Sequence, residues 1–106
     1  MATGRFGTYA LAATTNTTVY TVPTGFYSVY NVSFTNTSAS SVTIRLAMAS
    51  TASPAANEWI EYGTTIVANG VFERTGLVAQ AGLNIVAYTS AVGVNVNVYG
   101  IETSTS

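Results

Sequence analysis

The clearest hydrophobic pattern in the chain is a strict alternation over residues 42–49. Apolar side chains at Val42, Ile44, Leu46 and Met48 alternate with Thr43, Arg45, Ala47 and Ala49. A period of two is typical of a strand with one face in a core. Residues 26–35 give the longest expected strand, with Phe26, Tyr30, Val32 and Phe34 on one face and Ser28 as the polar exception there.

Turn residues divide the rest of the chain into similar short segments. Pro23-Thr24-Gly25 and Ala81-Gly82 mark two turns, and Asn69-Gly70 is the strongest hairpin signal, since both positions accept positive φ. The expected strands are 5–12, 17–22, 26–35, 42–49, 57–62 with an extension over 64–68 past a kink at Gly63, 71–75 continuing over 77–79 past Gly76, 83–89 and 94–102.

This series of about eight short strands, with no convincing helical window, indicates an all-β fold. Turns near every tenth residue predict an antiparallel β-sandwich, jelly-roll-like in type. The chain of 106 residues is the size of one domain, so we expect a single domain over 1–106, with residues 103–106 as a frayed tail.

Composition excludes several functional classes. Only 7% of the residues are charged, three arginines and four glutamates, and the chain has no Lys, Asp, His or Cys. Disulfides, thiolate chemistry and the usual zinc, copper and iron ligand sets are therefore excluded, and we expect no cofactor. Without a basic stripe we expect no nucleic-acid binding, and without a long apolar run we expect no membrane helix.

Catalytic residues are also scarce. Serine and threonine are abundant, but no His, Lys or Asp is present to act as their base. Glu58 and Glu61 form a close carboxylate pair, yet on a strand positions three apart face opposite sides and lie roughly 10 Å apart. We therefore expect that the protein is not an enzyme.

Four residues are candidate interface or ligand contacts: Arg45, Trp59, Tyr62 and Arg74. Arg45, on the outer face of the 42–49 strand, is either a rim contact to another protein or a solubilising residue. Arg74 is expected to pair with Glu58, Glu61 or Glu102 in preference to binding a ligand. Trp59 and Tyr62 could form a sugar-binding platform, although a single tryptophan in a small sandwich more often packs in the core.

The shortage of charge predicts assembly. Seven charged side chains cannot guard the edges of eight strands as charges do in monomeric sheet proteins. Protein interfaces are depleted in Lys, Glu and Asp and enriched in Tyr. We therefore expect that other subunits cover much of the outer surface, with a closed cyclic oligomer as the economical arrangement.

Five segments resemble small all-β structural proteins of tailed bacteriophages, especially phages of cyanobacteria. They are TTVYTVP at 17–23 with Gly25, NVSFTN at 31–36, ANEWIEY at 56–62, ERTGL at 73–77 and VNVYGIE at 96–102. The resemblance implies a β-sandwich without enzymatic activity, often trimeric on the shell, and it carries no catalytic or ligand residues.

The sequence and this resemblance together predict a virion structural protein. The main hypothesis is a capsid decoration, or cement, protein made in the host cytoplasm: a homotrimer on the capsid surface that binds the major capsid protein and reinforces the head shell. One alternative is a module that binds a host-surface glycan through Tyr and Trp. Another is a small tail or baseplate component.

Overall fold

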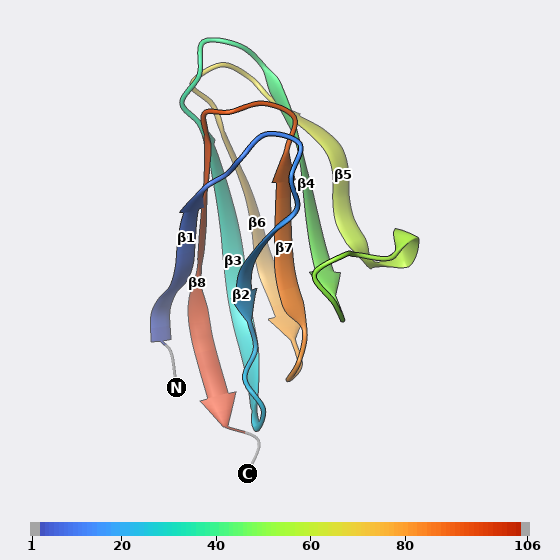
Figure 1. The fold of residues 1–106 in the computed structure, drawn as a ribbon. Helices are drawn as coiled ribbons and strands as arrows, with labels where there is room; N and C mark the ends of the chain where they lie inside the picture. The colour runs from blue at the N-terminus through green and yellow to red at the C-terminus, as the bar shows by residue number, and fades with distance from the viewer. Residues whose placement is uncertain (1–2, 105–106) are drawn as a thin grey trace.

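The computed structural model describes residues 3–104. Within these residues the chain forms eight strands and one short 3₁₀ helix (Figure 1). The elements are β1 (Thr3–Ala10), β2 (Thr17–Thr21), β3 (Phe26–Asn36), β4 (Val42–Ala49), η1 (Ala56–Glu58), β5 (Trp59–Ile66), β6 (Val71–Ala79), β7 (Asn84–Thr89) and β8 (Val94–Ser104). In the described part of the chain, no helix has the length and apolar character needed to cross a membrane.

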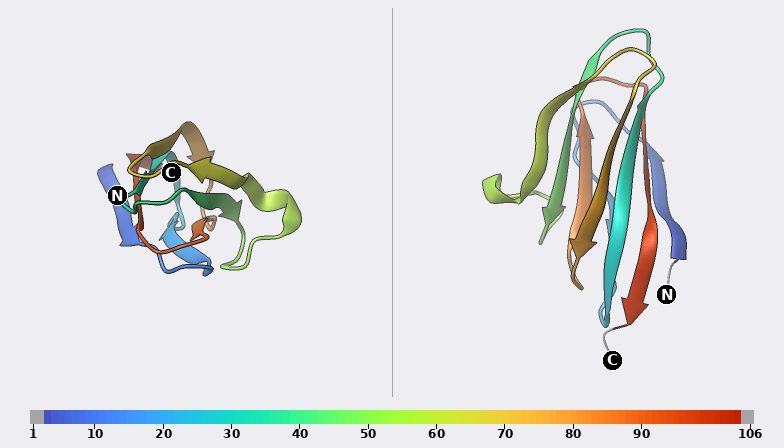
Figure 2. Two further views of the ribbon diagram at one scale, coloured as in Figure 1. Left: turned by 90° about the horizontal axis from the view of Figure 1, so that it is seen from above. Right: turned by 180° about the vertical axis from the view of Figure 1, so that it is seen from behind.

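The strands form two four-stranded sheets, which pack face to face as a sandwich (Figure 2). Sheet A has the order β1-β8-β3-β6 and sheet B the order β2-β7-β4-β5, with every pairing antiparallel. The pairs β1–β8, β2–β7, β3–β6 and β4–β5 are nested, as if one long hairpin had been rolled up. This nesting is the jelly-roll arrangement, so the predicted fold class is confirmed.

The core lies between the sheets and follows the predicted alternation. Tyr30, Val32 and Phe34 of β3 are fully buried, as are Ile44 and Leu46 of β4. Three valines of β8 complete this layer: Val94, Val96 and Val98. β-branched and aromatic residues suit these positions because they fit a pleated surface that is half buried.

All pairing irregularities fall on the four edge strands, β1, β6, β2 and β5. The central pairs β3–β8 and β4–β7 run in continuous register. The extra residues are Phe6 in β1, Val19 in β2, Ile60 and Gly63 in β5, and one residue of the Thr75–Gly76 pair in β6. Bulges bend an edge and hinder the addition of another strand, so they protect edges in a chain without lysine.

The predicted kinks at Gly63 and Gly76 are confirmed. Both glycines have positive φ, 88° and 72°, and both lie at these bulges. The backbone N–H of Gly76 donates to Asn31 Oδ1 at 3.0 Å, which satisfies a donor that the bulge removes from the ladder.

The turn between β5 and β6 lies one residue earlier than Asn69-Gly70 predicts. Gly70 N donates to Val67 O at 2.9 Å, so the central residues are Ala68 and Asn69. Asn69 has a φ of 60°, whereas Gly70 is outside the positive region. Gly70 is needed instead because the Val67 side chain packs closely against it, and a Cβ at this position would lie 2.8 Å from Val67 Cγ2.

The last strand is longer than the sequence indicated. Thr103 pairs with Tyr27 and Ser104 with Phe26, so β8 continues where a frayed tail was expected. Pairing with the start of β3 supplies backbone partners that a free tail would lack. Residues 105–106 of the expected tail lie outside the described residues.

Gly100 is required by a close approach of two strands. It lies opposite Tyr30, and a Cβ at this position would be 2.7 Å from Tyr30 Cα and closer still to Val29 O. Both atoms belong to the backbone of β3, which cannot move without disturbing the central pair.

We expect Gly100→Ala to lower the free energy of unfolding by about 2 kcal/mol or more, as overpacking does in a core. Urea unfolding followed by circular dichroism would measure this change. Asn95→Ala, at an exposed position of the same strand, is the matched control and should change stability by less than about 0.5 kcal/mol. Equal stability of the two variants would contradict the close approach.

Tyr30 contains a buried polar group that the core does not satisfy. Its side chain is fully buried, and its hydroxyl has no hydrogen-bond partner among residues 3–104. Burial disfavours the phenolate and raises the pKa of Tyr30 well above its ordinary value of 10.0.

Tyr30→Phe should therefore keep or raise the free energy of unfolding at pH 7, by up to about 1 kcal/mol. Above pH 10 the unfolded wild-type chain loses the phenol proton while the folded chain keeps it, so wild-type stability falls by up to about 1.4 kcal/mol per pH unit through this group. Tyr30→Phe has no phenol group at this position, so this part of the fall in stability at high pH should be absent. Urea unfolding at pH 7 and about pH 11 measures the free energy of unfolding of both proteins. A variant clearly less stable than wild type at pH 7 would contradict the expectation.

Candidate functional site

An arginine held between two tyrosines lies on the outer face of sheet B. Arg45 of β4 pairs laterally with Tyr62 of β5 and Tyr88 of β7. The Arg45 Cζ atom is 4.1 Å from the centre of the Tyr62 ring and 4.4 Å from that of Tyr88. Because cation–π contacts extend to about 6 Å, both rings hold the guanidinium in place.

Trp59 joins this group through the bulge at Ile60. In a regular strand Trp59 and Tyr62, three positions apart, would face opposite sides. Here Trp59 pairs with Ala47 and Tyr62 with Arg45, two positions that share the outer face of β4. The two rings meet edge to face, with centroids 5.4 Å apart and an interplanar angle of 71°.

Trp59 is half-buried, and it lies outside the interior of the sandwich where a single tryptophan was expected. It packs over Ala47, Ala49 and Val86 on the outer face of sheet B. Its ring centre is 6.0 Å from Arg45 Cζ. Small residues on β4 make room for the indole ring, which explains why the outer side of this strand is also buried.

A hollow of about 430 Å³ lies beside these rings, lined by Ala56, Trp59 and Tyr62. One wall comes from η1, which projects from the side of the sandwich in the connection between β4 and β5 (Figure 1). Tyr62 is 64% exposed, so one ring of the group is open to solvent.

Glu58 holds the connection that carries η1. Its carboxylate accepts hydrogen bonds from Ala55 N at 2.8 Å and Ser50 N at 3.0 Å, and from the Ser50 hydroxyl at 3.2 Å. The bond from Ala55, followed by that from Ser50, lowers the pKa of Glu58 below its usual range. The Glu58 side chain thus binds the connection between β4 and β5 at two points, Ser50 and Ala55, and holds η1 beside the hollow.

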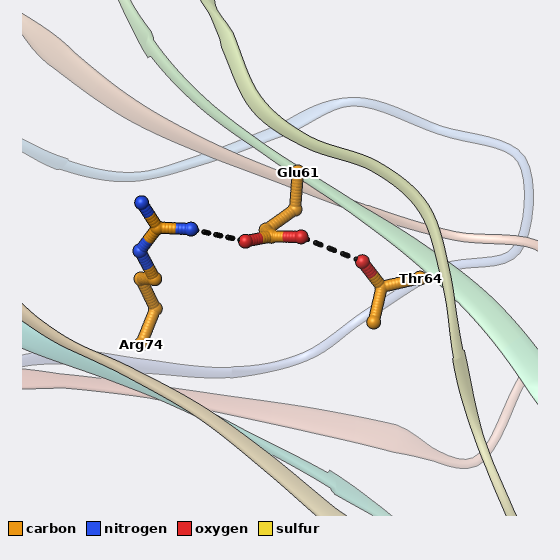
Figure 3. A network of polar contacts seen from close by, with 3 residues as sticks. All are labelled: Glu61, Thr64 and Arg74. Atoms are coloured by element: carbon orange, nitrogen blue, oxygen red, sulfur yellow. Dashed lines mark hydrogen bonds and ion pairs between the residues drawn. The ribbon is translucent and has the colours of Figure 1, made fainter.

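Arg74 forms an ion pair with Glu61, which also accepts from the Thr64 hydroxyl at 2.7 Å (Figure 3). The pair joins β6 of sheet A to β5 of sheet B across one open side of the sandwich. This finding confirms the ion-pair interpretation of Arg74. Glu58 and Glu61 bind separate partners.

The burial of Glu102 was not predicted from the sequence. Only 2% exposed, it accepts hydrogen bonds from Tyr20 Oη and from Ser28 Oγ at 3.1 Å. Burial, and then the bond to Glu102, raise the pKa of Tyr20. Ser28, the polar exception on the inner face of β3, is thereby explained as a partner of this carboxylate.

Glu73 is used on the outer face of sheet A. It accepts a hydrogen bond from the Tyr99 hydroxyl, which raises the pKa of Tyr99.

Among the described residues, no group of three or more His, Cys, Asp or Glu side chains could hold a metal ion. The Arg45 group offers in-plane N–H donors and aromatic faces, which are means of noncovalent recognition.

Comparisons with protein-family models, with curated proteins and with solved structures find no significant match to this chain.

We expect the Arg74–Glu61 pair to contribute a coupling energy of about 0.5–1 kcal/mol, since its side chains are 42% and 19% exposed and solvent screens them. A double-mutant cycle with Glu61→Gln and Arg74→Met, measured by urea unfolding, gives this value, and high salt should reduce it. Glu58→Gln combined with Arg74→Met is the control and should give no coupling. Equal coupling in both cycles would contradict the pairing.

Proposed function

We propose that this protein is a virion structural subunit, most simply a capsid decoration protein that forms a homotrimer and binds the major capsid protein. The observation that carries the proposal is the use of charge. All four glutamates, together with Arg45 and Arg74, contact other groups of the same chain. Apart from Arg5, which is exposed, the outer surface therefore offers mainly hydroxyl, amide and apolar groups to a partner, which suits a surface covered by neighbours.

The outer face of sheet A supports a contact of this kind. Val29 of β3 pairs with Val78 of β6 on one side and Ile101 of β8 on the other. The three side chains are 43%, 57% and 59% exposed, and Tyr27 lies two positions from Val29 on the same face. A continuous apolar row across three strands favours docking on another protein.

The contacts proposed here use sheet faces. The shortage of charge predicts that subunits cover the edges and much of the outer face. Since the bulges of β1, β2, β5 and β6 hinder strand addition at the edges, the faces are the more suitable part of that surface. A decoration protein of this shape would lie against the shell through the row at Val29. Binding to the assembled shell alone would then stabilise that shell by mass action.

We expect virions that carry the protein to release DNA at a higher temperature than virions without it. Val29→Asp should reduce occupancy of the shell and remove the thermal gain, because it places a charge in the apolar row. Val92→Asp, at a 68% exposed position of the connection between β7 and β8, is the matched control and should behave as wild type.

Equal thermal release of DNA with and without the protein would refute the decoration role. A virion map that places the protein in the tail would favour the tail or baseplate alternative. The mass of the purified chain in solution tests the trimer independently of the shell.

A further inference from the structure

Arg45 has no acidic partner in the described part of the chain, although it is held firmly. The ion pair found within residues 3–104 uses Arg74, and Glu58 and Glu61 bind the partners described above. Tyr62 and Tyr88 contact the guanidinium over their rings. A guanidinium carries five N–H donors, and the two rings supply no oxygen acceptor for them, so these donors can bind an acceptor from outside.

The hollow beside Arg45 adds a surface of a different chemistry. It is lined by Trp59, Tyr62 and Ala56, and its volume of about 430 Å³ lies within the range of small-molecule sites, roughly 300–1,000 Å³. Aromatic faces here adjoin a fixed cation, since Tyr62 belongs both to the hollow and to the contacts of Arg45.

We propose that this site binds an acidic saccharide. The sugar ring has an apolar face of C–H groups, which packs on the exposed ring of Tyr62, while its edge contacts Trp59, whose ring stands at 71° to that of Tyr62. The hydroxyls on its rim stay in water. Its carboxylate accepts hydrogen bonds from the in-plane N–H groups of Arg45, a charge-assisted geometry that fits a planar guanidinium. The contacts with Tyr62 and Tyr88 reduce the entropy that Arg45 would otherwise lose on binding.

The charge of the site favours this ligand over its competitors. A neutral sugar would use the rings but leave the guanidinium unpaired. A nucleic acid would require several cations for its phosphates, whereas the rings of this site surround a single arginine. The proposal is separate from the shell role, because it uses the outer face of sheet B while the apolar row at Val29 lies on sheet A.

Trp59 makes the proposal easy to test, since it is the single tryptophan of the chain and it lines the hollow. Titration with trigalacturonate should give a saturable change in tryptophan fluorescence. The fully methyl-esterified trimer, which keeps the ring but lacks the charge, should bind about tenfold more weakly or worse. Added salt should weaken binding of the acid but not of the ester.

Two variants separate the contribution of the cation from that of the aromatic ring. Arg45→Gln should remove the preference for the acid over its ester, and Tyr62→Ala, at an exposed position, should weaken binding of both by about tenfold. Arg5→Gln and Tyr27→Ala are the matched controls, at exposed positions of sheet A, and should bind as wild type. Thermal unfolding shows whether each variant is folded. If Arg45→Gln does not fold, Tyr62→Ala still tests the site.

Equal affinity for the acid and the ester, or no fluorescence change up to about 10 mM trimer, would overturn the proposal. So would a change in the solution mass of Tyr62→Ala, which would identify this face as a contact between copies. If the protein binds the sugar but does not raise the temperature at which virions release DNA, the proposed function is rejected and the sugar site is not.

Discussion

Regular pairing of the four central strands is the constraint on which the rest of this molecule depends. β3–β8 and β4–β7 run without a break in register, so their inner side chains meet as one apolar layer. A slip of one residue in either pair would turn that layer to solvent. The bends needed to close the sandwich are therefore placed in β1, β2, β5 and β6, where a bulge disturbs one neighbour instead of two. The Ile60 bulge that creates the aromatic site is one of these bends.

Three charged residues lie where the two sheets are joined: Glu61, Arg74 and Glu102. Glu61 and Arg74 link one open side, while Tyr20 reaches from β2 to Glu102 on β8 elsewhere. Phe6 and Tyr20 stack with centroids 4.8 Å apart and close the other side. At the end where β3 leaves sheet A, the buried Asn36 side chain donates to the backbone carbonyls of Ile66 and Val67 on the β5 side. These three charged residues hold the sandwich together internally, whereas Glu58, Glu73 and Arg45 contact groups within one connection or one sheet.

The sequence predicted the fold better than the site, for physical reasons. Alternation identifies strands and their inner faces from local order alone, which is why Val42, Ile44 and Leu46 were placed correctly. The Arg45 group depends on lateral register, so Tyr88 could not be recognised before its strand was known to lie beside β4. Trp59 and Tyr62 share a face only because Ile60 is an extra residue, and no composition rule marks a bulge without glycine. Glu102 was considered only as a possible partner of Arg74, because its actual partners, Tyr20 and Ser28, lie on β2 and β3 and are distant in sequence.

The nested pairing also has a consequence for how the chain folds. The β4–β5 pair closes a loop over residues 50–58, whereas the β1–β8 pair closes almost the whole chain. The entropy lost on loop closure rises with loop length, so the central hairpin is the least costly place to start and the outermost pair the most costly. Folding that proceeds outward from the middle of the sequence would bring each later pair together across a segment already shortened by the earlier ones. Such non-local topologies reach the native state in milliseconds to seconds, far more slowly than helical bundles of similar size.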